Sequence, residues 1–254
     1  MKAMIFAAGV GSRLKPFTDA HPKALVEIGG KPILGLVIAK LAAAGVDKII
    51  INVHHFADQI YDYLSANDFG VAIDVSDESD KLLDTGGGIV AAADKLSEGT
   101  DGPFIVHNAD ILTDFDIKPM IEQWLGTRPM ALLMAEDRAS SRKLLFDHDM
   151  HMRGWINTAT HEVKPPCLDA ATAAKCGQLA FGGVHILSPD ILPHLCRYAA
   201  QTGESKPKFS ITDFYISQCG ALDIRAYRPP LPYRWYDVGK PETLQAARAA
   251  FAQD

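Results

Sequence analysis

The most informative segment for the architecture lies at the N-terminus: Lys2-Ala3-Met4-Ile5-Phe6-Ala7-Ala8-Gly9-Val10-Gly11-Ser12-Arg13-Leu14. Residues 2–8 form a largely apolar run that stops at glycine, which is typical of a buried parallel strand. Glycine adopts positive φ and lets the backbone approach a ligand closely. Successive N–H groups after a strand make a cradle for phosphate. The stretch therefore predicts a buried strand followed by an anion-binding loop.

Two common phosphate-binding motifs do not fit this loop. The dinucleotide fingerprint G-x-G-x-x-G fails because Leu14 takes its third glycine position, and no G-K-[ST] ends the loop as in a P-loop. The loop instead carries Arg13, whose planar guanidinium suits phosphate oxygens. Ten residues later, Lys23 adds a compact charge. A tight turn with two surface cations is the alternative, but the combination after a strand favours a triphosphate site.

Strand-like and helix-like segments alternate through the first half of the chain. After strand 2–8, the pattern predicts strands at 48–53, 71–75, 103–107 and 130–134 and helices at 33–44, 56–66, 88–97 and 116–125. This rhythm predicts an α/β fold with a mainly parallel central sheet and helices on both faces. The second half is less regular. It suggests a hairpin at 144–158, a strand at 178–187 and helices at 189–200, 210–218 and 241–252.

Composition excludes several classes of partner. The chain has 254 residues and a formal net charge of -6, with no basic stripe, so nucleic acid is not expected to bind. No apolar stretch approaches the roughly 20 residues that span a bilayer, and no membrane partner is expected. The 4 cysteines form no CxxC pair. We interpret them as reduced thiols of a cytoplasmic protein.

A carboxylate just beyond the end of a predicted strand is a candidate metal ligand. Asp110 closely follows the strand predicted at 103–107, and ligands of parallel sheets bind beyond the carboxyl ends of the strands. Mg²⁺ takes few protein carboxylates, together with phosphate oxygens and water. A helix N-cap or a loop position is the alternative role, for which Asp114 and Asp116 compete.

These segments resemble those of a known family. The N-terminal run, with Pro16-Phe17-Thr18 and Pro22-Lys23-Ala24-Leu25, resembles the signature of sugar nucleotidyltransferases, also called NDP-sugar pyrophosphorylases. A second motif resembles the family pattern W-x-D-x-G-[TK]-P-E: Trp235-Tyr236-Asp237-Val238-Gly239-Lys240-Pro241-Glu242. The resemblance implies a Rossmann-like nucleotide-diphospho-sugar transferase fold. It also implies an enzyme that joins a nucleoside triphosphate to a sugar 1-phosphate and releases pyrophosphate.

The resemblance also implies roles for individual residues. Arg13 and Lys23 contact the phosphates and stabilise the transition state, while Asp110 and Asp237 hold the catalytic Mg²⁺. No general base is needed, because a phosphate monoester is already an anion near neutral pH. We expect one domain over residues 1–254, of which 1–135 bind the nucleotide and 136–254 bind the sugar phosphate. Nucleotide contacts are implied for Ala8, Gly9, Gly11, Ser12, Arg13, Thr85, Gly86, Gly87 and Asn108.

Two further segments bear on the base and the sugar. The run Leu83-Asp84-Thr85-Gly86-Gly87-Gly88 suits a backbone that lies against a ligand, with a flexible loop as the alternative. It resembles the branch of N-acetylmuramate 1-phosphate uridylyltransferases and mannose-1-phosphate guanylyltransferase-like proteins, which implies base and ribose contacts. Phe181, Gly182 and Gly183 resemble the family's sugar-facing strand, although Gly182 replaces a usual Ser or Thr. Glu162-Val163-Lys164-Pro165 departs from the family's E-K-P by an inserted residue, so its roles are not carried over.

Several functions remain open from the sequence. UTP with an N-acetylmuramate-type sugar phosphate is expected first, and GTP with mannose or heptose 1-phosphate is the close alternative. A phosphocholine cytidylyltransferase is a third possibility. A glycosyltransferase is disfavoured, because the usual D-x-D motif is replaced by Asn108-Ala109-Asp110. A non-catalytic nucleotide-sugar-binding regulatory protein is disfavoured too, because Lys23 and both aspartates are present.

Overall fold

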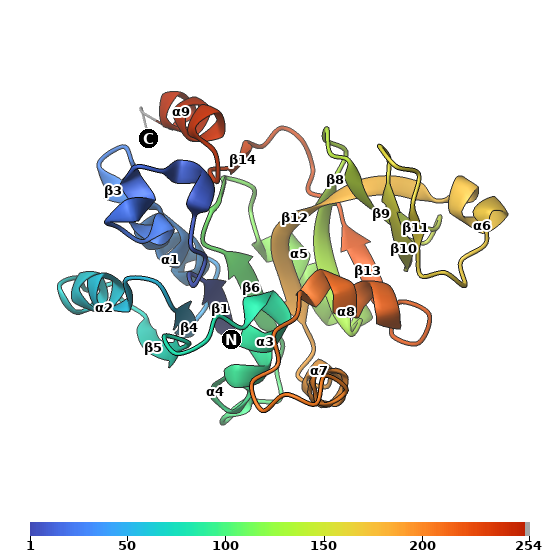
Figure 1. Cartoon of the computed structure of the whole chain (residues 1–254), viewed down its shortest axis with the longest axis horizontal. Helices are drawn as coiled ribbons and strands as arrows, with labels where there is room; N and C mark the ends of the chain where they lie inside the picture. Colours follow the sequence, from blue (N-terminus) through green and yellow to red (C-terminus); the bar gives the residue numbers. More distant parts are fainter. Residues whose placement is uncertain (252–254) are drawn as a thin grey trace.

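A computed structural model describes residues 1–251 (Figure 1). Four parallel strands form one part of the central sheet, in the order β6 (Phe104–Asn108), β1 (Lys2–Phe6), β4 (Lys48–Val53) and β5 (Ala72–Asp77). The antiparallel strand β12 (Gly177–Leu187) follows β6. Next come β8 (Ala131–Glu136), antiparallel to β12, and β13 (Ile224–Tyr227), parallel to β8. The expectation of a mainly parallel α/β sheet is confirmed: among these seven strands, β12 runs against the other six.

The first-half elements lie close to their expected ranges. The predicted strands are β1, β4, β5, β6 and β8, and the predicted helices include α1 (Ile33–Ala43), α2 (Ala57–Ser65) and α5 (Lys118–Thr127). Strand β1 ends at Phe6, because residues 7–11 already belong to the loop. Short 3-10 turns follow the loop at Ser12–Leu14, Phe17–Asp19 and Lys23–Leu25, and a small ribbon pairs β2 (Glu27–Ile28) with β3 (Lys31–Pro32).

The second half is built around the long strand β12. Its first residues pair with β9 (Arg142–Phe146), which continues into β10 (Met152–Asn157) and β11 (Val163–Lys164). The expected hairpin is therefore confirmed. The helices α7 (Ile191–Ala200), α8 (Ile211–Gln218) and α9 (Pro241–Ala250) match expectation, and the predicted position 252 lies outside the described residues. The sequence patterns missed α6 (Ala170–Lys175) and the short paired strands β7 (Ile111–Thr113) and β14 (Trp235–Asp237).

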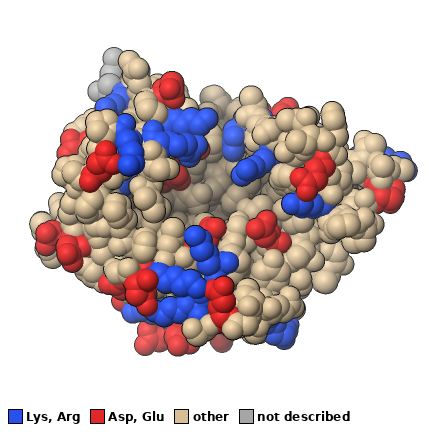
Figure 2. All heavy atoms as spheres, viewed as in Figure 1, with Lys and Arg blue, Asp and Glu red and all other residues tan. Residues whose placement is uncertain are grey.

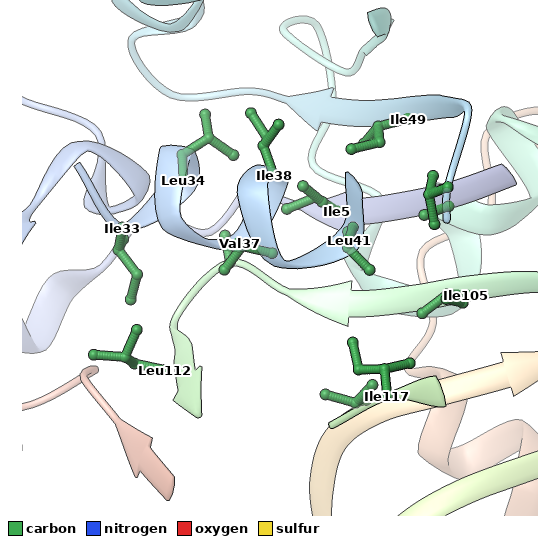
Figure 3. Close-up of a cluster of buried hydrophobic side chains, with 14 of the residues drawn as sticks. Ile5, Ile33, Leu34, Val37, Ile38, Leu41, Ile49, Ile105, Leu112 and Ile117 are labelled. Atoms are coloured by element: carbon green, nitrogen blue, oxygen red, sulfur yellow. The ribbon is translucent and has the colours of Figure 1, made fainter. Parts of the chain in front are cut away.

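Helices cover both faces of the sheet. On one face, α1 buries an apolar stripe against Ile5, Ile49 and Ile105, as Figure 3 shows. Truncating such a buried Leu or Ile to Ala costs about 2–5 kcal/mol. On the other face, α7 and α8 pack with Phe104 and Met4. The members of the α1 stripe are Ile33, Leu34, Val37, Ile38 and Leu41.

The glycine run of residues 86–88 corrects one expectation. The sequence suggested a loop followed by a helix at 88–97, but α3 (Asp84–Ala91) already contains all three glycines and α4 (Ala93–Ser97) is separate. A Cβ at Gly86 would collide with the Phe209 ring, and one at Gly87 would collide with the Pro207 carbonyl. Glycine lowers helix propensity by about 1 kcal/mol per residue. Here it allows the segment 207–209 to cross the helix at close range.

No helix within residues 1–251 is both long and apolar enough to cross a bilayer. The 4 cysteines of the chain are all free thiols in the structure.

Candidate active site

A cavity of about 400 Å³ lies at the carboxyl ends of β1, β4 and β6, where ligands of parallel sheets bind. The space-filling view shows a central hollow with Lys and Arg atoms along its rims (Figure 2). Of the residues predicted to bind nucleotide or metal, Gly86, Gly87 and Asp237 do not line this cavity. The predicted residues that do line it are Ala8, Gly9, Gly11, Ser12, Arg13, Lys23, Thr85, Asn108 and Asp110.

The loop after β1 is shaped by Gly11. Its φ of 68° lies in the left-handed region, which favours glycine. A Cβ there would come within 2.9 Å of both Lys23 Cβ and Thr18 Cγ2. The Thr18 hydroxyl donates to the Gly11 carbonyl at 2.9 Å. Gly11 thus lets the segment with Lys23 pack directly on the loop, and this brings the two halves of the N-terminal motif together.

Four charged side chains meet beside this loop. Lys23 Nζ donates to Asp110 Oδ2, and Lys23 is only 9% exposed. A Cβ atom added at Gly239 would lie 2.6 Å from Arg13 Nη2, 2.7 Å from Asp237 Oδ1 and 2.8 Å from Lys23 Nζ. Gly239 is therefore a site residue without a predicted role, and its missing side chain leaves room for these charges.

The two aspartates come from paired strands. Asp237 ends β14 and pairs with Ile111 of β7, while the Val238 N–H donates to the Asp110 carbonyl at 2.9 Å. The Gly239 N–H donates to Asp237 Oδ1 at 2.8 Å. Asp110 Oδ1 and Asp237 Oδ2 have no hydrogen bond within residues 1–251. The structure brings the two predicted ligands together and leaves one oxygen of each available. No cluster of three or more potential metal ligands exists in the same range.

The residues predicted to contact sugar lie beside β14. Gly182 accepts a hydrogen bond from Trp235 Nε1 at 2.9 Å, and the β12 register shifts between Phe181 and His185. A Cβ at Gly182 would collide with the Met134 sulfur. Gly183 has a φ of 77°, and a Cβ there would lie 3.1 Å from Asn108 Nδ2. These glycines allow β12 to bend against β6 and β14, but they do not line the 400 Å³ cavity.

A buried polar network that the sequence analysis missed joins three segments around the cavity. Asn52 Oδ1 accepts from the Ala7 N–H at 2.8 Å, and Asn52 Nδ2 donates to Glu78 Oε1 at 2.8 Å. Glu78 Oε2 accepts from the Leu83 N–H at 3.1 Å. Burial raises the pKa of Glu78, which is 1% exposed. The network ties the glycine loop to β4 and to the start of α3. The polar Asn52 inside an apolar strand was the signal available in the sequence.

Lys208 is a second missed residue, and it lines the cavity. Its segment is fixed to the other rim: the Phe209 N–H donates to the Leu83 carbonyl at 3.2 Å, and the Gly86 N–H donates to the Phe209 carbonyl at 2.9 Å. Lys206 pairs with Asp80. Lys208 itself makes no hydrogen bond or ion pair within residues 1–251. Nothing local in the sequence marked it, because its place depends on contacts with residues 80–87.

Glu162 and Lys164 lie away from this site. They pair with each other at 3.2 Å, and Lys164 Nζ lies 5.3 Å from the centre of the Trp155 ring. Both contacts belong to the β10–β11 extension. The E-K-P resemblance therefore adds no residue to the cavity.

Comparison with known proteins places the chain in a family. Residues 2–143 match the family model described as "Nucleotidyl transferase". The chain is 32% identical over 258 residues to N-acetylmuramate alpha-1-phosphate uridylyltransferase of Caulobacter vibrioides, covering 99% of this chain and 97% of the relative. It is 27% identical over 247 residues to mannose-1-phosphate guanylyltransferase 1 of Arabidopsis thaliana, covering 95% of this chain and 62% of that protein.

The fold also matches solved structures. A putative glucose-1-phosphate thymidylyltransferase from Bacillus anthracis aligns over 100% of this chain and 96% of its own, with a TM-score of 0.80 at 20% identity. This similarity shows the fold, and the family model with the full-length relative shows the class. The chain belongs to the nucleotidyl transferase family and is a sugar-1-phosphate nucleotidyltransferase.

Proposed function

We propose that the protein couples UTP to an N-acetylmuramate-type sugar 1-phosphate. A phosphate oxygen of the sugar attacks the α-phosphorus of UTP, the bond from that phosphorus to the β-phosphate oxygen breaks, and pyrophosphate leaves. The observation that carries the proposal is the convergence of Arg13, Lys23 and Asp110 on the nucleotide cavity, with Asp237 beside them. The choice of UTP and of the sugar is supported by the full-length relative at 32% identity.

The residues of the site act mainly by position and charge. Arg13 and Lys23 place two cations at the loop, where they neutralise charge that develops on the α-phosphate and on the leaving pyrophosphate. The backbone of residues 8–12 binds phosphate oxygens, and the Asn52–Glu78 network holds that backbone in place. Holding the two substrates in a reactive geometry supplies much of the remaining acceleration.

A divalent cation fits the two aspartates. One oxygen of Asp110 and one of Asp237 are free of hydrogen bonds within the described chain, and Mg²⁺ is commonly held by one or two carboxylates with substrate phosphates. Arg13 and Lys23 lie close enough to balance those carboxylates when no cation is bound. When bound, Mg²⁺ would supply Lewis-acid stabilisation of phosphate charge.

Pyrophosphate release, measured with four nucleoside triphosphates and a panel of sugar phosphates, tests the assignment. We expect UTP with N-acetylmuramate 1-phosphate to give the highest kcat/KM. A mismatched base leaves buried polar groups unpaired at about 1–3 kcal/mol each, which corresponds to roughly fivefold to 150-fold in selectivity. If GTP with mannose or heptose 1-phosphate has the higher kcat/KM, the uridylyl assignment is wrong. The similarity to the Arabidopsis enzyme is the observation that supports this guanylyl alternative.

Lys208 provides a separate prediction. Its unpaired ammonium lines the cavity, and a hydrogen bond to a charged group contributes about 1.5–3 kcal/mol. We expect Lys208→Met to raise the KM for the nucleoside triphosphate about tenfold, with a smaller change in kcat. Lys118→Met, at an exposed position on α5, is the matched control. An unchanged KM in the Lys208 variant would show that this lysine does not contact the nucleotide.

A further inference from the structure

A second cavity of about 290 Å³ lies at the same edge of the sheet as the nucleotide cavity. Strands β8 and β13 run in the same direction as β6 and β1, so their carboxyl ends share that edge. The nucleotide cavity occupies the ends of β1, β4 and β6, and the second cavity occupies the ends of β8 and β13. Its lining residues are Ala135, Glu136, Asp137, Arg138, Arg228, Pro229, Leu231, Tyr233 and Trp235.

One strand connects the second cavity to the site of Asp237. Trp235 lines the cavity and starts β14, the strand that ends at Asp237. Its ring donates to the Gly182 carbonyl at 2.9 Å, and Arg138 stacks on the ring with 4.2 Å between Cζ and the ring centre. Arg138 Nη2 also donates to the Phe181 carbonyl at 2.9 Å. The cavity therefore borders the part of β12 that we expect to face the sugar.

The charges of the lining leave one cation without a partner. Glu136 Oε1 lies 3.0 Å from Arg138 Nε, and its other oxygen accepts from the Tyr233 hydroxyl at 3.0 Å. Asp137 lies 3.4 Å from Lys143 Nζ, outside the lining. Arg228 is exposed and has no hydrogen bond or ion pair within residues 1–251. Glu136, Asp137 and Arg138 each lie within 4 Å of an opposite charge. Among the charged residues of the lining, Arg228 is thus the one whose guanidinium is available to a ligand.

We propose that the second cavity is a subsite for an acidic substituent on the sugar and that Arg228 binds its carboxylate. The proposal rests on the proposed function, because N-acetylmuramate carries a lactyl carboxylate that N-acetylglucosamine lacks. A guanidinium binds a carboxylate through two parallel hydrogen bonds, a geometry that an ammonium does not offer. In this proposal the sugar ring lies on the stacked side chains of Arg138 and Trp235. Arg228 then binds the carboxylate of the lactyl group.

The test compares two sugar phosphates that differ in this substituent. The full chain is assayed with UTP and either N-acetylmuramate 1-phosphate or N-acetylglucosamine 1-phosphate, and the ratio of the two kcat/KM values is measured. We expect Arg228→Gln to lower the ratio of acidic to neutral sugar about tenfold. Arg228→Glu should lower it further through charge repulsion. Arg197→Gln, at an exposed position of α7 outside both cavities, is the matched control and should leave the ratio unchanged.

Two results would overturn the inference in different ways. If the wild-type enzyme prefers the acidic sugar and Arg228→Gln keeps that preference, or loses activity equally on both sugars, the subsite is wrong while the proposed function stands. If the wild-type enzyme uses only the neutral sugar phosphate, the proposed substrate is wrong and the inference fails with it. Thermal melting of each variant separates either result from loss of folding.

Discussion

Replacing Lys23 by alanine should lower kcat by about 10²–10³, the typical cost of removing one group that stabilises transition-state charge. Lys23 is 9% exposed, lines the nucleotide cavity and donates to Asp110. Its ammonium lies on the same side of Gly239 as the guanidinium of Arg13. We expect the loss mainly in kcat, because the phosphate charge that we propose Lys23 stabilises develops during the reaction.

The measurement is steady-state pyrophosphate release with Lys15→Ala as the control. Lys15 belongs to the same loop, but its side chain is 63% exposed and pairs with Asp19 at 2.8 Å, away from the cavity. Exposed pairs of this kind contribute little to stability, so the control should keep both its activity and its melting temperature. If Lys23→Ala has wild-type kcat and kcat/KM, Lys23 has no part in the chemistry.

The sequence predicted those parts of the fold that depend on local pattern. Apolar runs bounded by turn residues located the parallel strands, and the glycine loop with Arg13 and Lys23 was placed at the carboxyl end of the first of them. Asp110 was placed by the same rule, since it follows another parallel strand. The meeting of Asp110 with Asp237 was implied only by resemblance to a family, because nothing local relates residues so far apart.

The remaining features depend on contacts between distant segments. The glycines of α3 are explained by Phe209 and Pro207, which lie more than a hundred residues away in the chain. A run of three glycines predicts a loop when only the sequence is considered, because the segment that packs against the glycines is not apparent from it. Lys208 was missed for the same reason. The antiparallel course of β12 was also missed, because a buried strand has the same apolar pattern in either direction.

Replacing either aspartate by asparagine should cost at least about a hundredfold in kcat/KM at a fixed Mg²⁺ concentration. A bound metal contributes several kcal/mol of stabilisation to transition-state charge, and about 1.4 kcal/mol corresponds to a factor of ten. Asparagine keeps the size of the side chain, so Asp237→Asn retains an oxygen for the Gly239 N–H. Asp116→Asn is the control, because Asp116 is exposed and its oxygen accepts from the Lys118 N–H, which asparagine also satisfies.

If Asp110 and Asp237 hold the same ion, the double variant tests this more sharply than either single variant. The backbones of the two residues are joined by β7–β14 pairing and by the bond from Val238 to Asp110. Residues that act as a unit have non-additive effects, so the double variant should lose little more activity than the worse single variant. Mn²⁺ binding, followed by electron paramagnetic resonance, should weaken in both single variants. Additive losses, or unchanged Mn²⁺ affinity in one variant, would show that the two carboxylates do not hold the same ion.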